Sequence, residues 1–212
     1  ECFKKHVEAA KAKGGLDLNC EEVKYTKKGV KVDISDSRLI EQKQEGLYSV
    51  YLHPAGGQIT LENLKEIIMT LETCEAPEIR LSMTEGVYFR NLNGNEAKDV
   101  LEITKGMGGE NDFEQSVSCI GVPTCQMGVC DSQDALREMI SYVKENNGAT
   151  EYLPKVYFSG CGNSCGVHEI GAIGFMGKMK RVDGQLLESF ELFIDGSYKE
   201  NEARLAEKYG EI

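Results

Sequence analysis

Residues 46–105, GLYSVYLHPAGGQITLENLKEIIMTLETCEAPEIRLSMTEGVYFRNLNGNEAKDVLEITK, decide the fold of the first part of the chain. The apolar run at 47–52 predicts a strand, and Thr60 is placed to cap a helix that follows it. The apolar stripe expected on that helix consists of Leu61, Leu64, Ile68 and Leu71.

Two more strands and a second helix complete this pattern. Residues 78–83 and 87–91 predict strands joined by a turn at 84–86, and residues 95–105 predict the helix. The order strand, helix, strand, strand, helix is typical of a ferredoxin-like split unit, so we expect an α+β fold.

The two ends of the chain are less regular. The N-terminal flank, residues 1–37, predicts a small appendage in which residues 1–13 form a helix and residues 22–25 and 30–34 form a hairpin. The last stretch, residues 202–212, is expected to contain a helix and to stop just after it. Because the chain opens on Glu rather than Met and ends without a tail-like stretch, we expect it to be a fragment of a longer protein.

A glycine-rich break at residues 106–111 precedes a second module. Its expected helix has apolar residues at helical spacing, namely Leu136, Met139, Ile140 and Val143. Its expected strands cover residues 155–159, 170–176 and 187–194, with a turn at Asp183-Gly184 before the last strand. We therefore expect one domain over residues 38–111 and a second over residues 112–212.

Composition and charge exclude several classes of protein. The apolar fraction of 41% is ordinary for a folded globular chain, and the formal net charge is −11 with acidic residues spread along the sequence. Nucleic acid and anionic membrane surfaces are therefore not expected as partners. No apolar run approaches the roughly 20 residues needed to cross a bilayer, so the sequence predicts a soluble, cytoplasmic protein.

The cysteines are the strongest chemical signal in the sequence. Eight cysteines in a cytosolic chain are expected to stay reduced, so clustered ones indicate metal ligands rather than disulfides. Cys119 and Cys125 stand in C-x5-C spacing, and Cys161 and Cys165 in C-x3-C spacing, both in glycine-rich segments. Small residues let backbone N–H groups approach the sulfides of an iron–sulfur cluster. The other cysteines are expected to be packed or idle thiols: Cys2, Cys20, Cys74 and Cys130.

Two other interpretations of the four clustered cysteines stay open. A structural zinc site also uses four thiolates, but they usually come from tight C-x2-C knuckles, which are absent here. Buried free cysteines would be expected on the apolar faces of helices or strands rather than in glycine-rich loops. The spacing therefore favours an iron–sulfur cluster over zinc and over free thiols.

The two cysteine segments, SCIGVPTC at 118–125 and GCGNSCG at 160–166, resemble the signature of the siroheme-containing nitrite and sulfite reductases. The resemblance runs in the family's order from about residue 38 to residue 197. Other stretches that resemble the C-terminal ferredoxin-like repeat of this family and its neighbouring strands are residues 42–48, 56–57, 79–82 and 169–177.

The resemblance implies a [4Fe-4S] cluster on Cys119, Cys125, Cys161 and Cys165, with the sulfur of Cys165 also reaching the iron of siroheme. It implies a ferredoxin-like domain over residues 38–111 and an α/β siroheme/[4Fe-4S] domain over residues 112–212, truncated at its C-terminus. The implied activity is the six-electron reduction of sulfite to sulfide or of nitrite to ammonia.

The resemblance also implies partners for the chain. The missing N-terminal half of the parent protein would supply most of the basic residues around siroheme, so the chain alone is expected to be inactive. Electrons would come from a donor such as ferredoxin or a flavin domain.

Three more residues are candidates for the site. The resemblance implies cofactor contacts from Arg80 and Asn163, although Arg80 could equally pair with a neighbouring acid. His168 is a candidate proton donor, because the reduction of an oxyanion consumes protons and histidine titrates near neutral pH. The alternative for His168 is an ordinary surface or core histidine.

Two other functions fit the cysteines alone. One is an iron–sulfur electron-transfer or redox-sensing module, which needs the four thiolates but no haem pocket. The other is a non-enzymatic domain stabilised by zinc. Optical spectra distinguish these functions, because siroheme and iron–sulfur clusters absorb visible light and zinc does not.

Overall fold

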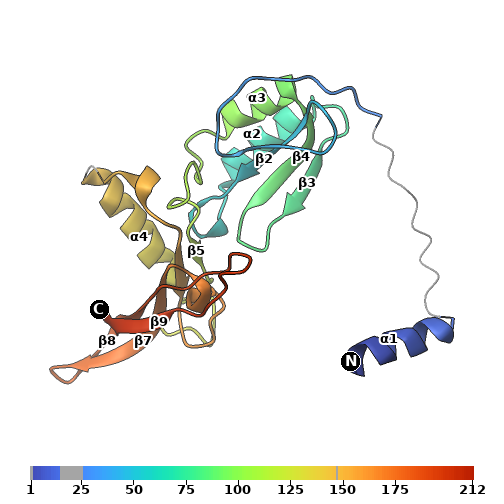
Figure 1. Ribbon diagram of the computed structural model, residues 1–212. Helices are drawn as coiled ribbons and strands as arrows, with labels where there is room; N and C mark the ends of the chain where they lie inside the picture. Colours follow the sequence, from blue (N-terminus) through green and yellow to red (C-terminus); the bar gives the residue numbers. More distant parts are fainter. Residues whose placement is uncertain (1, 15–25, 147) are drawn as a thin grey trace.

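The computed structural model describes residues 2–14, 26–146 and 148–212, which contain two sheets. The first module is a four-stranded antiparallel sheet in the order β1-β2-β4-β3, with α2 and α3 packed on it (Figure 1). Its elements are β1 (Leu39–Glu41), β2 (Leu47–Leu52), α2 (Leu61–Leu71), β3 (Glu78–Leu81), β4 (Val87–Asn93) and α3 (Gly94–Ile103). The predicted ferredoxin-like order of elements is therefore confirmed.

The buried face of α2 differs from the predicted stripe. Leu71 is buried as expected, but Leu61, Leu64 and Ile68 are 40 to 60% exposed, and Ile67 lies in the core instead. Because α2 carries apolar residues around most of its circumference, periodicity alone does not select one face. Packing against the sheet determines the buried face, since Ile67 and Leu71 lie one turn apart in the core cluster formed with β2 and β4.

The second module combines a five-stranded sheet with one long helix. The strands lie in the order β5-β6-β7-β8-β9, in which β5, β6 and β7 are parallel neighbours and the other pairs are antiparallel. Leu136 and Ile140 of the helix pack on this sheet, which confirms the predicted helix face. The elements are β5 (Val117–Ser118), α4 (Ser132–Glu145), β6 (Val156–Ser159), β7 (Ile173–Val182), β8 (Gln185–Ile194) and β9 (Glu207–Glu211).

Three short 3-10 helices join these elements: η1 (Ala55–Gly57), η2 (Thr150–Tyr152) and η3 (His168–Ile170). A helix near the N-terminus, α1 (Cys2–Ala12), confirms the helical prediction there and has no buried residue. Within the part of the chain that the structure describes, no helix is long and apolar enough to cross a membrane.

The predicted hairpin in the N-terminal flank is wrong for residues 30–34, and residues 22–25 lie outside the described ranges. Residues 30–34 form no strand in the structure. Val30 bonds instead to two glycines of the first module: its N–H donates to Gly46 O (2.9 Å) and its carbonyl accepts from Gly94 N–H (2.9 Å). The alternating pattern is explained by Val32 and Ile34, which pack against the first core.

The predicted helix over residues 202–212 is also wrong, because β9 occupies this segment. β9 pairs antiparallel with β8, with Leu192 opposite Gly210. The open edge of β8 offers a row of backbone hydrogen bonds, and pairing with it outweighs a weak local helical preference.

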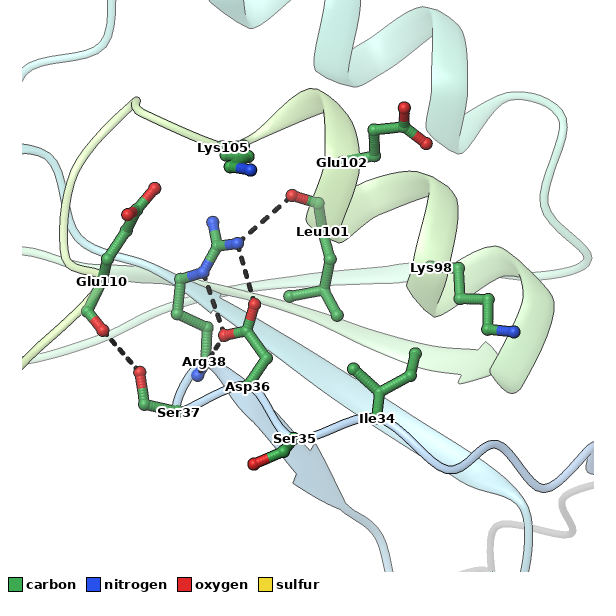
Figure 2. Close-up of a pocket in the computed structure, with 10 residues that line it drawn as sticks. All are labelled: Ile34, Ser35, Asp36, Ser37, Arg38, Lys98, Leu101, Glu102, Lys105 and Glu110. Atoms are coloured by element: carbon green, nitrogen blue, oxygen red, sulfur yellow. Dashed lines mark hydrogen bonds and ion pairs between the residues drawn. The ribbon is translucent and has the colours of Figure 1, made fainter.

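A polar pocket beside α3 is lined in part by Arg38 (Figure 2). The Arg38 guanidinium pairs with Asp36 (Nη2 to Oδ2, 3.1 Å) and donates to the carbonyls of Leu101 and Thr104, each at 3.2 Å. A buried cation at these last carbonyls of α3 fixes the segment before β1 against the helix end. None of the four clustered cysteines lines this pocket, and the contacts of Arg38 with the end of α3 give it a structural role.

Candidate metal centre

The four clustered cysteines lie on two loops that leave the same edge of the second sheet. The first cysteine loop, residues 119–131, follows β5, and the second cysteine loop, residues 160–167, follows β6. β5 and β6 are parallel and in register, with Ser118 opposite Phe158. Because the carboxyl ends of parallel neighbours meet at one sheet edge, the two loops start side by side.

Backbone hydrogen bonds join the two cysteine loops around Gly160. Its N–H donates to Cys119 Sγ (3.1 Å), and its carbonyl accepts from the N–H groups of Val129 (2.9 Å) and Cys130 (3.1 Å). A Cβ on Gly160 would lie 2.7 Å from Cys130 O and 3.2 Å from the Cα of Gly121. The loops can therefore approach this closely only with glycine at position 160.

The structure places the four cysteines near the surface. Cys119, Cys125 and Cys161 are half-buried, and Cys165 is exposed. Among the described residues, no three histidine, cysteine or acidic side chains converge as a preformed metal site. The donor set fits a cluster in its chemistry, since four thiols lie on two contacting, glycine-rich loops and one sulfur already accepts a backbone N–H. Their role as ligands stays a prediction.

Cys130 has a different environment from the four candidates. Its side chain is fully buried, and its Sγ donates to the carbonyls of Lys178 (3.4 Å) and Ser189 (3.5 Å). Burial raises the pKa of the Cys130 thiol, which keeps it protonated. Cys130 is therefore a packed thiol, as predicted.

His168 is buried beneath the second cysteine loop. Only 1% of the residue is exposed, and its Nδ1 lies 2.9 Å from Ser159 Oγ and 3.2 Å from Ser164 Oγ. Its ring packs against Phe193, with 4.9 Å between the centroids. Burial holds the pKa of His168 below its usual range, so the ring is neutral at neutral pH. These contacts support the turn at Ser164, and the role of proton donor stays a prediction.

The two candidate cofactor contacts are exposed. Arg80, on β3, pairs with Glu78 at 3.2 Å, which is the ordinary ion pair that the sequence left open. Asn163 lies in the second cysteine loop between Cys161 and Cys165. Contacts of Arg80 and Asn163 with a cofactor remain predictions.

Glu85 is a residue of this region that the sequence did not single out. It lies in the turn between β3 and β4, and its Oε2 accepts the N–H of Ser118, the residue before Cys119, at 3.1 Å. Burial raises the pKa of the Glu85 carboxyl to about 7, although the Ser118 N–H opposes the shift. The sequence showed only a turn here, because the partner is 33 residues away.

Glu85→Gln should flatten part of the pH dependence of stability. The pKa of Glu85 is about 7 in the folded chain and 4.5 as its ordinary value, so between these pH values the carboxyl is ionised in the unfolded chain and takes up a proton on folding. Its contribution to stability therefore falls as pH rises through this window. Between pH 5 and pH 8 the unsubstituted chain should lose stability from the ionisation of Glu85, and Glu85→Gln should not. The difference in the free energy of unfolding between Glu85→Gln and the unsubstituted chain should therefore grow by about 1 to 2 kcal/mol in favour of Glu85→Gln. This is less than the pKa shift alone would give, because the side chain is partly exposed. Urea unfolding across this range measures it, and parallel pH profiles would contradict it.

The first module matches a known protein family. Residues 40–106 match the family described as the nitrite/sulfite reductase ferredoxin-like half domain. The matched stretch covers the first module from β1 to the end of α3.

Curated relatives extend the similarity into the second module. Ferredoxin–nitrite reductase of Synechococcus elongatus is 28% identical over 174 residues, covering 79% of this chain and 33% of that protein. The sulfite reductase [NADPH] hemoprotein beta-component of Bacillus licheniformis is 23% identical over 150 residues, covering 63% of this chain and 26% of that protein. The chain thus spans about a third of the length of the curated relatives it matches.

A solved structure shows the same fold over almost the whole chain. The NirA protein of Mycobacterium tuberculosis superposes with a TM-score of 0.75 at 18% identity, covering 99% of this chain and 39% of NirA. Both modules described above therefore have counterparts in that structure.

Proposed function

Because the chain belongs to the nitrite and sulfite reductase family, we propose that it is the cluster-bearing half of a siroheme- and [4Fe-4S]-dependent reductase of sulfite or nitrite. The observation that carries this proposal is the contact between the two cysteine loops at Gly121 and Gly160. It holds a C-x5-C pair and a C-x3-C pair at one sheet edge, where four thiolates can serve one cluster.

Each cysteine has a proposed role in holding the cofactors. Cys119, Cys125, Cys161 and Cys165 would ligate the cluster, and the exposed position of Cys165 favours it as the thiolate shared with siroheme. When bound, these cofactors supply single electrons to an oxyanion. The backbone N–H of Gly160, which already donates to Cys119 Sγ, would stabilise the negative charge on that thiolate.

The remaining parts of the proposal concern partners. Arg80 and Asn163 are exposed, and we propose that they contact siroheme carboxylates, for which Arg80 would leave its ion pair with Glu78. We propose that further basic residues come from an N-terminal half of the parent protein. The net charge of −11 supports this division, since an acidic chain needs a basic complement to bind an anionic cofactor and an anionic substrate. Ferredoxin is the proposed donor, because several of the relatives are named as ferredoxin-dependent.

Anaerobic reconstitution tests this function directly. The chain is incubated with ferrous iron, sulfide and siroheme, alone and together with the N-terminal half of its parent protein, and then desalted. We expect about four iron atoms per chain in both samples, not counting the iron of siroheme, and more bound siroheme when the second half is present. Iron without siroheme in both samples would indicate an electron-transfer module. A colourless protein that retains one zinc ion would indicate the zinc-stabilised domain.

A further inference from the structure

The first cysteine loop is attached to the first module at both of its ends. Ser118 immediately precedes the loop at the end of β5, and Gln133 lies just beyond it in the first turn of α4. Both residues are buried, and each makes a hydrogen bond to the first module. The ends of the loop are therefore placed by residues distant in the sequence.

The attachment before the loop is made by Glu85. Its Oε2 accepts the Ser118 N–H at 3.1 Å, immediately before Cys119. Glu85 has a φ of +67°, which is an uncommon backbone conformation for a residue with a side chain. Glu85 adopts it within the turn between β3 and β4. Gly57 packs behind it, since a Cβ there would lie 3.1 Å from the Glu85 Cβ.

The attachment after the loop is made by Gln133, and it uses both ends of the side-chain amide. Its Nε2 donates to Gly56 O at 2.8 Å, and its Oε1 accepts from Gln58 Nε2 at 2.8 Å. Gln133 is 8% exposed, so loss of these partners would leave a buried amide unsatisfied. A Cβ on Gly56 would lie 3.3 Å from the Gln133 side chain, and Gly56 has a φ of +67°.

We infer that Glu85 and Gln133 form an interdomain clamp that sets the position of the first cysteine loop relative to the second. The inference rests on the proposed function, because the clamp matters chemically only if both loops serve one cluster. Neither residue is proposed as a ligand. They are positioning residues, through which the first module controls how well Cys119 and Cys125 meet Cys161 and Cys165.

The clamp is tested in the cofactor-free chain by the alkylation rate of each cysteine, measured by peptide mass spectrometry after timed exposure to iodoacetamide. Glu85→Ala and Gln133→Ala should raise the rates at Cys119 and Cys125 by about tenfold, the change in a local opening equilibrium expected for one lost buried hydrogen bond. The rate at Cys165 should not change, and Cys130 should stay protected because it reports on global unfolding.

Matched variants separate the clamp from general damage. Glu85→Gln keeps an acceptor for Ser118 N–H and, compared at about pH 6, where the Glu85 carboxyl is also uncharged, should behave like the unsubstituted chain. Met83→Ala changes a fully exposed residue next to the same turn and should have no effect. If Glu85→Ala or Gln133→Ala exposes Cys130, these variants unfold globally and Gln58→Ala becomes the test of the clamp. Gln58 is exposed and donates one hydrogen bond to Gln133, so its replacement should raise the alkylation rates at Cys119 and Cys125 by about threefold.

Unchanged rates at Cys119 and Cys125 in Glu85→Ala, Gln133→Ala and Gln58→Ala would overturn the clamp. After reconstitution, Glu85→Ala and Gln133→Ala should also release iron to a chelator faster than Glu85→Gln. Failure of the unsubstituted chain to take up iron would count against the proposed function alone, since the alkylation pattern is measured without any metal.

Discussion

Gly166→Ala is expected to destabilise the second module by more than about 3 kcal/mol or to prevent its folding. Gly166 directly follows Cys165, and a Cβ there would lie 1.8 Å from Phe158 O and 2.6 Å from Phe158 C. These atoms belong to β6, which is paired on both sides, so no side-chain rotation relieves the clash. The N–H of Gly166 also donates to Ser159 Oγ at 3.1 Å, which fixes the turn from the same strand.

Gly162→Ala is the matched control in the same loop. A Cβ on Gly162 would meet only Met176 Sδ, at 3.8 Å, which is ordinary van der Waals contact. We expect a change within about 0.5 kcal/mol. Urea unfolding of the cofactor-free variants measures both effects, and equal stabilities for Gly162→Ala and Gly166→Ala would show that the close contact of Gly166 with β6 does not determine this turn.

This pair shows what the sequence could and could not predict about the site. Glycines flanking the second cysteine pair were recognisable as turn formers, and so was their association with a cluster. Which glycine is indispensable depends on its distance to β6, a contact between a loop and the strand before it that has no signature in the sequence. The same limit applies to Gly160 and Gly121, whose mutual approach joins loops about 40 residues apart.

Strands and helices with strong periodicity could be predicted, because local pattern and burial agree there. The first module from β2 to α3 and the hairpin of β7 and β8 are examples. The prediction failed where tertiary pairing decided the outcome: β9 takes the open edge of β8, and residues 30–34 pack against the first core without joining its sheet.

Buried polar residues were the other feature that local reasoning could not find. His168 attracted notice through its position after Cys165, but its burial between Ser159, Ser164 and Phe193 depends on three other segments of the second module. Glu85 had no signal beyond a turn. Its pKa is raised by burial, and its hydrogen-bond partner Ser118 belongs to the second module, 33 residues away. The sequence shows such residues, but only the assembled fold shows their environment.

Serine replacement of any one of the four proposed ligands should remove most of the iron. We expect Cys119→Ser, Cys125→Ser, Cys161→Ser and Cys165→Ser to retain less than about one iron per chain after reconstitution, against about four in the unsubstituted chain, because a cubane cluster needs all four thiolates. The fold should survive these changes. At position 119, the hardest case, a serine hydroxyl still offers an acceptor to the N–H of Gly160.

Cys130→Ala provides the control for this series, since it removes a fifth nearby thiol that the structure buries completely. We expect full iron content in this variant, with a loss of stability of about 1 kcal/mol from the small cavity. Iron analysis and the visible spectrum of each purified variant measure the outcome. If Cys130→Ala lost its iron while one of the four serine variants kept it, Cys130 would replace that cysteine as a ligand. The second cysteine pair and β8 would then have to shift, because the Cys130 sulfur is held between Lys178 O and Ser189 O. The depth of that burial is the physical reason for expecting the opposite result.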